Sequence, residues 1–154
     1  MVPVEVIVVS VLPISELRGG IPLALYYGLD PLSAYVVCVL SNLLPVPFLL
    51  YALEKLEGLI SSLPIVGELY RYIVHRVEKR KGLVEAYGYL GLAAFVAVPL
   101  PVTGAWTGSL LAFLLRLEKG RTFASISLGV ATAGAVVTLA TLGIFNLSSL
   151  LRVL

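Results

Sequence analysis

The chain has 154 residues, of which 59% are hydrophobic and only 13% are charged, whereas soluble domains contain about 45–50% apolar and about 25% charged residues. The mean hydropathy of the whole chain is +1.01, which excludes a separate soluble domain beside a membrane-embedded one. The formal net charge is +2, and the single cysteine, Cys38, excludes an internal disulfide. The composition therefore predicts one integral membrane domain over residues 1–154.

Apolar runs alternate with two charged stretches along the chain. Residues 1–29 begin without the basic segment of a signal peptide, so we expect them to be embedded in the membrane. The runs 32–53 and 122–145 are each long enough to cross a bilayer, for which about 20 residues are needed. Residues 1–29 and 89–115 are each compatible with one crossing helix or with the two short limbs of a hairpin.

The distribution of basic residues favours the hairpins. If both ambiguous segments enter and leave on one side, the stretches 54–88 and 116–121 share a side of the membrane. That side then holds nine of the eleven Lys and Arg residues, namely Lys55, Arg71, Arg76, Lys79, Arg80, Lys81, Arg116, Lys119 and Arg121. Because cytoplasmic loops carry the excess of Lys and Arg, we predict that both stretches face the cytoplasm and that both chain ends lie opposite.

Helix-breaking residues occur where the two hairpins would turn. The first hairpin contains Pro13, Gly19, Gly20 and Pro22, and the second contains Pro99, Pro101, Gly104 and Gly108. Non-helical backbone at membrane depth has to be buried in protein or line a wet cavity. We therefore interpret these eight residues as the hairpin turns, near the middle of the membrane.

The two halves of the chain resemble each other. At an offset of 88 (101 minus 13), the positions that carry identical residues in both halves include Leu12, Pro13, Gly20, Leu23, Ala24, Leu29 and Leu40. The sequence thus predicts an all-α membrane protein with two inverted repeats, 1–53 and 89–154, each a re-entrant hairpin followed by a crossing helix. An amphipathic surface helix within 54–88 would join them. Secondary transporters use this architecture.

Three ordered motifs, "PISELRGGIP", "SNLLPVPF" and "PLPVTGAWTG", resemble the signatures of the small multidrug export protein family, a distant relative of the DedA membrane protein superfamily. Val102 departs from the glycine expected in the last motif. The resemblance implies a membrane transporter with paired re-entrant hairpins. Members of the DedA group are associated with moving polyprenyl-phosphate lipid carriers across the bilayer.

Glu16 and Arg18 are the sharpest functional signal, because they lie among the breakers of the first hairpin. A charge at the bilayer centre costs at least about 2.5–3.5 kcal/mol, and such residues usually mark a transport pathway. In a functional interpretation, Arg18 attracts an anionic headgroup through its planar fork, and Glu16 exchanges a proton. In a structural interpretation, the two side chains form an internal ion pair that holds the hairpin.

Four further residues complete the predicted substrate and proton pathway: Asn42, Thr103, Trp106 and Thr107. The threonines, beside freed backbone N–H groups, would bind an anion or water, or would serve the fold alone. Trp106 would otherwise be a packing or interface aromatic. Asn42 would line the cavity, or would bond to a neighbouring helix.

The most concrete functional hypothesis is a proton-coupled secondary transporter of an amphipathic anion, such as a polyprenyl-phosphate lipid carrier. The alternatives are a small-molecule multidrug exporter, for which Glu16 would recognise cations, and a non-transporting membrane scaffold. We expect no enzyme, cofactor, metal or nucleic-acid partner, since no motif for these occurs. We also expect a homo-oligomer, with a dimer favoured, because four membrane elements cover broken backbone only thinly.

Overall fold

The computed structural model describes residues 2–62, 75, 81–99 and 103–153, and every regular element among them is a helix. In chain order the elements are α1 (Val4–Val11), α2 (Glu16–Tyr26), α3 (Pro31–Leu43), α4 (Pro45–Ser62), α6 (Gly82–Ala97), α7 (Ala105–Leu114) and α8 (Lys119–Val153). Two stretches, Pro31–Leu53 and Lys119–Ile144, are long and apolar enough to cross a membrane. They match the predicted crossing runs 32–53 and 122–145 closely.

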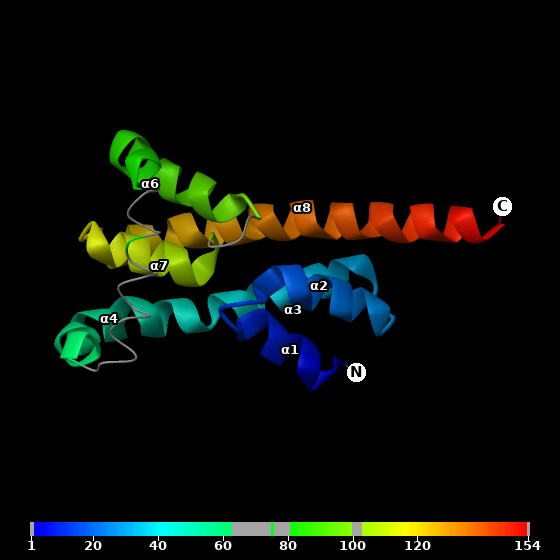
Figure 1. The fold of residues 1–154 in the computed structure, drawn as a ribbon, viewed down its shortest axis with the longest axis horizontal. Helices are drawn as coiled ribbons and strands as arrows, with labels where there is room; N and C mark the ends of the chain where they lie inside the picture. Colours follow the sequence, from blue (N-terminus) through cyan, green and yellow to red (C-terminus); the bar gives the residue numbers. More distant parts are fainter. Residues whose placement is uncertain (1, 63–74, 76–80, 100–102, 154) are drawn as a thin grey trace.

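Two short helical pairs, α1–α2 and α6–α7, lie along the longer helices (Figure 1). The long helix α8 runs antiparallel to α3 and α4 along the length of the molecule (Figure 1). The α1–α2 pair lies toward the end that holds both chain termini, and the α6–α7 pair lies toward the opposite end. Each pair is antiparallel, so the break between α1 and α2 and the break between α6 and α7 both fall near the centre.

The exterior of this bundle is strongly apolar. Ile14 is 91% exposed, Leu90 74% and Phe48 71%. A soluble protein rarely leaves large apolar surfaces uncovered, whereas lipid tails would cover them without cost. The exposed residues and the two long apolar helices are those of a membrane protein.

Local sequence signals explain how the first crossing stretch begins and bends. The Asp30 carboxylate accepts a hydrogen bond of 2.9 Å from the Ser33 N–H, which caps α3, and Pro31 occupies the first helical position. The bonds from Ser33 hold the pKa of the Asp30 carboxyl below its usual value. Leu44 separates α3 from α4, and Pro45 suits the start of α4 because the first position needs no amide hydrogen.

The structure differs from the prediction in what several breakers do. Pro13 and Pro99 lie in the breaks between helices, but Gly19, Gly20 and Pro22 lie inside α2. A Cβ on Gly20 would collide with the Ser10 hydroxyl of α1. The glycines therefore allow α1 and α2 to pack closely, as small residues do between membrane helices.

The same correction applies to Gly108 in the second hairpin. It lies inside α7, and a Cβ there would come within 2.6 Å of the Val96 side chain of α6. Gly108 thus permits the close packing of α6 against α7. Gly104 does lie in the break, while Pro101 lies outside the described residues.

The surface helix predicted within 54–88 also needs correction at both ends. Residues 54–62 continue α4, and residues 82–88 belong to α6. Extending an existing helix adds one hydrogen bond for each residue fixed, whereas starting a new helix is unfavourable. Gly88 has φ 57° and ψ −130°, so α6 is kinked where the predicted apolar segment 89–115 begins. His75 is exposed, and the remainder of the predicted helix, 63–74 and 76–80, lies outside the described residues.

The close packing of α6 on α8 gives a test of the fold. A Cβ on Gly129 would lie 2.6 Å from the Val96 Cβ and 2.7 Å from the Ala93 carbonyl oxygen. We expect Gly129→Ala to lower the free energy of unfolding by about 1–3 kcal/mol, the usual cost of overpacking. Thermal unfolding in lipid nanodiscs measures the effect.

The matched control is Gly143→Ala, because this glycine lies on the same helix and no described atom lies within 4 Å of an added Cβ. It should leave stability unchanged or raise it by up to about 1 kcal/mol through helix propensity. Equal melting temperatures for the two variants would contradict the close approach of α6 and α8.

Candidate functional site

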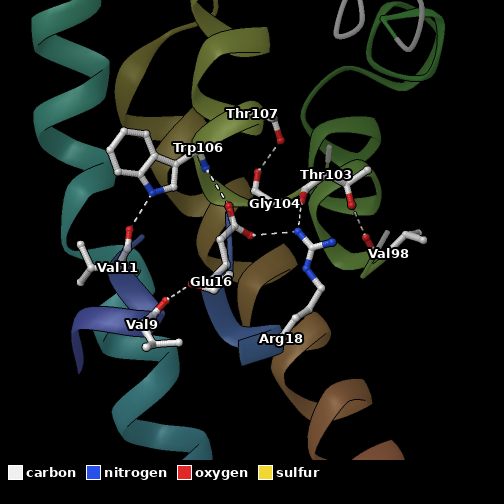
Figure 2. A network of polar contacts seen from close by, with 10 residues as sticks. Val9, Val11, Glu16, Arg18, Val98, Thr103, Gly104, Trp106 and Thr107 are labelled. Atoms are coloured by element: carbon white, nitrogen blue, oxygen red, sulfur yellow. Dashed lines mark hydrogen bonds and ion pairs between the residues drawn. The ribbon is translucent and has the colours of Figure 1, made fainter. Parts of the chain in front are cut away.

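Glu16 lies at the start of α2, where the first hairpin breaks. Its backbone has φ 48°, the left-handed region that costs a residue with a side chain about 1–2 kcal/mol. The residue is only 4% exposed. This backbone conformation places the carboxylate toward the second hairpin, as Figure 2 shows.

The carboxylate of Glu16 meets the beginning of α7. The Trp106 backbone N–H donates to Glu16 Oε1 at 3.5 Å, in the first turn of a helix that begins at Ala105. The free N–H groups of a helix start and its dipole favour an anion. Gly104 has φ 139°, and a Cβ on it would overlap the Glu16 carboxylate. A glycine is therefore required here for the acid to reach α7.

Arg18 connects the same acid to the chain before α7. Its Nη2 lies 3.8 Å from Glu16 Oε2 and donates to the Thr103 carbonyl oxygen at 3.1 Å (Figure 2). The Arg18 side chain is 27% exposed, whereas that of Glu16 is 5% exposed. The cation is thus the more accessible member of the pair.

Trp106 holds the two hairpins together from the other side. Its indole N–H donates to the Val11 carbonyl oxygen, the last residue of α1, at 2.9 Å. That carbonyl belongs to the unsatisfied end of a helix, so the indole supplies a partner that lipid could not. Trp106 therefore contacts the first hairpin through its side chain as well as its backbone.

Asn42 faces the pair from α3. It is fully buried, and among the residues that the structure describes neither its amide nitrogen nor its amide oxygen has a hydrogen-bond partner. Together with Glu16 and Arg18 it lines a small cavity, in which the centre of a water molecule has about 10 Å³ available. This is close to the space that a single buried water needs.

The hydroxyls of both threonines bond to nearby backbone carbonyl oxygens. The Thr103 hydroxyl donates to the Val98 carbonyl oxygen at 2.5 Å, and it is the Thr103 backbone carbonyl that reaches Arg18. The Thr107 hydroxyl donates at 3.4 Å to the carbonyl oxygen of Gly104, the residue that precedes α7. Glu16, Arg18, Asn42 and Thr103 are brought together around the cavity, and Thr107 is not among its lining residues.

Sequence reasoning did not anticipate two parts of this site. The first is the Val11 carbonyl, which no side-chain pattern can reveal. The second is the role of Gly104 as the surface on which the carboxylate rests. A signal for it existed, because the offset of 88 that relates the two halves pairs position 16 with position 104 (104 minus 16).

The all-helical structure, its two long apolar helices and its apolar exterior are consistent with a helical membrane protein. The family described as "Putative small multi-drug export protein" matches residues 16–136, from Glu16 into α8, and the chain belongs to this family. The family description points to export and away from an enzyme. No curated protein and no solved structure matches the chain.

The contact between Glu16 and Gly104 can be tested by substitution. Gly104→Ala would displace the carboxylate and strain the backbone, so we expect it to lower the free energy of unfolding by about 2 kcal/mol or more. Glu16→Ala in addition removes the collision and leaves only the backbone strain.

The double variant should therefore be more stable than the sum of the two single effects predicts, by about 0.5–3 kcal/mol, as for residues in contact. Urea or thermal unfolding of the four proteins gives this coupling energy. Strict additivity would show that the carboxylate does not rest on Gly104.

Proposed function

We propose that the protein is a secondary transporter that exports a small amphipathic anion, with a lipid phosphate such as a polyprenyl-phosphate carrier as the leading substrate class. Family membership supports export. The lipid class follows from the distant relationship to the DedA superfamily that the motif resemblance implies. Substrate would pass between the two hairpin breaks. Glu16 would carry the coupled proton, and Arg18 would bind the anionic headgroup.

The acid–base pair at the contact between the hairpins carries this proposal. Ionisable residues inside a membrane protein are costly and usually belong to a pathway. Here the acid, the base and an unpartnered amide line one cavity between elements from both halves of the chain. An ion pair that served only folding would not explain why the polar amide of Asn42 is buried at the same cavity.

The relative exposure of the pair favours an anionic substrate. A molecule that approaches the site meets the guanidinium of Arg18, at 27% exposure, before the carboxylate of Glu16, at 5%. The guanidinium can form two parallel hydrogen bonds with a phosphate. The cavity holds about one water, so the hairpin breaks would have to separate before substrate binds.

Export of small cationic drugs is the second candidate, because the family description names multidrug export. In that case Glu16 would bind the substrate and Arg18 would be its internal counter-ion. A non-transporting scaffold would need neither an exchangeable proton nor a substrate.

The proposed transport cycle depends on an inverted arrangement of the two hairpins, with residues 54–88 and 116–121 in the cytoplasm. Single cysteines at Lys81, Arg121 and Val2, in a Cys38→Ala background, test this arrangement. We expect an impermeant thiol reagent to label Lys81→Cys and Arg121→Cys from the cytoplasmic side and Val2→Cys from the opposite side. Labelling of Lys81→Cys and Arg121→Cys from opposite sides would rule it out.

Transport by Glu16 and Arg18 variants tests the function itself. Glu16→Gln keeps the shape and the bond from the Trp106 N–H but cannot exchange a proton, so pH-driven transport in proteoliposomes should be abolished. Arg18→Lys keeps the charge but loses the planar fork, so the apparent affinity for a phosphate headgroup should fall about tenfold.

The controls are Glu5→Gln and Arg121→Lys, which make the same changes at exposed positions. Both should transport like the unmodified chain. Transport rate per folded molecule is measured beside the melting temperature, so that misfolding is counted separately. Normal pH-driven transport by a well-folded Glu16→Gln protein would disprove the coupling role. A preference for cations that Arg18→Lys leaves unchanged would favour the drug exporter.

A further inference from the structure

A larger cavity lies away from the central pair, between α4, α7 and the beginning of α8. Its volume is about 370 Å³, within the range of small-molecule sites. Leu50, Phe113 and Leu117 supply apolar walls, and Arg116 and Lys119 supply two cations. Because one candidate membrane span begins at Lys119, the cavity lies where lipid headgroups would meet the protein.

Arg116 occupies a backbone position at which glycine is usual. The N–H groups of Arg116 and Leu117 bond to the Phe113 and Ala112 carbonyls, each at 3.0 Å, which is the Schellman pattern that ends a helix. The residue in the left-handed position of this pattern is Arg116, with φ 52°. Glycine adopts this conformation freely and arginine does not.

The first half of the chain has the same cap with the expected residue. At the end of α2, Gly28 has φ 82° and its N–H and that of Leu29 bond back to Leu25 and Ala24. Gly28 corresponds to Arg116 at the offset of 88 (116 minus 28). The strained arginine thus replaces glycine in the copy of the cap that borders this cavity, which is typical of a residue kept for its side chain.

The charges around the cavity favour an anion. The acidic residue of the same loop, Glu118, pairs with Arg121 at 3.0 Å and is not among the residues lining the cavity. The Lys119 ammonium lies 4.4 Å from the centre of the Tyr51 ring, which holds it beside α4. An arginine fork, a lysine and an adjoining apolar wall together match an anionic phosphate that carries a hydrocarbon chain.

We propose that this cavity binds the phosphate headgroup of an anionic lipid, with Arg116 as the main contact and the start of the acyl chains against Leu50 and Phe113. The site is separate from the Glu16–Arg18 pair and does not depend on the transport proposal. It would anchor the α7–α8 connection to the headgroup layer.

Lipid retention by the full chain tests the site. The protein is incorporated into vesicles of phosphatidylcholine with phosphatidylglycerol, extracted in mild detergent, and examined by native mass spectrometry. We expect Arg116→Gly to retain phosphatidylglycerol about tenfold less, the effect of losing a bidentate charged contact. Its melting temperature in detergent should be unchanged or higher, because glycine relieves the strained backbone.

Two further variants distinguish the loss of the Arg116 side chain from the loss of any positive charge. Arg116→Gln keeps the strained backbone and should lose the lipid as Arg116→Gly does. Lys81→Gln removes one positive charge at an exposed position outside the cavity, leaves the Glu118–Arg121 pair intact, and should retain the lipid. An equal loss in Lys81→Gln, or full retention in the Arg116 variants, would overturn the proposal.

Competition distinguishes a lipid from free phosphate. Inorganic phosphate and glycerol phosphate, which lack the acyl chains, should displace phosphatidylglycerol only at concentrations far above those of the lipid. Displacement at matching concentrations would mean that the cavity binds soluble phosphates, and the lipid assignment would then be wrong.

Discussion

The burial of one carboxylate determines how the centre of this molecule is built. Glu16 is 4% exposed, and a buried charge is tolerated only with hydrogen-bond and charge partners. Its partners are the Trp106 N–H and the Arg18 guanidinium. The contact with the Trp106 N–H requires α7 to begin at the tip of the second hairpin. The contact with the guanidinium requires Arg18 to lie two residues after Glu16 in α2. Both hairpins therefore have to be broken at the same depth.

The sequence predicted the positions of the helix breaks well but the function of the glycines poorly. Proline in an apolar run often indicates a break, and Pro13 and Pro99 do lie between helices, whereas Pro22 lies inside α2. Glycine is ambiguous, since it serves both turns and close helix contacts. Only the positions of Ser10 and Val96 on neighbouring helices show that Gly20 and Gly108 belong to the second kind.

Backbone groups limit any prediction of this site from side chains alone. Thr103 was singled out for its hydroxyl, yet its carbonyl oxygen accepts the bond from Arg18. Trp106 was singled out for its ring, yet its backbone N–H reaches Glu16. Broken membrane helices expose such groups regularly, because the ends of each segment lack intrahelical partners. Asn42 could be named in advance because a fully buried amide in an apolar helix is unusual whatever surrounds it.

Helix boundaries keep the spacing of the proposed inverted repeat. The helices α2 and α7 end at Tyr26 and Leu114, and α3 and α8 begin at Pro31 and Lys119, so both pairs differ by 88 (114 minus 26, and 119 minus 31). Among the described residues, the two non-glycine positions with positive φ are Glu16 and Arg116. Each corresponds at this spacing to a glycine in the other half, Gly104 and Gly28. Positions 28 and 116 share a left-handed bend, whereas the backbones of Glu16 (φ 48°) and Gly104 (φ 139°) differ. In each pair one position carries a charge and the other is a glycine.

This difference has a steric cause at the centre of the molecule. In a two-fold arrangement, a residue close to the axis contacts its own equivalent in the other half. Position 16 and position 104 are such a pair, since the Glu16 carboxylate rests on Gly104. Two acids there would collide and repel each other, and two glycines would leave the start of α7 without an anion. Only the unequal combination of one acid and one glycine fills the contact. The proposed symmetry is therefore broken at the point where the two halves touch, which leaves one acid at the contact instead of two.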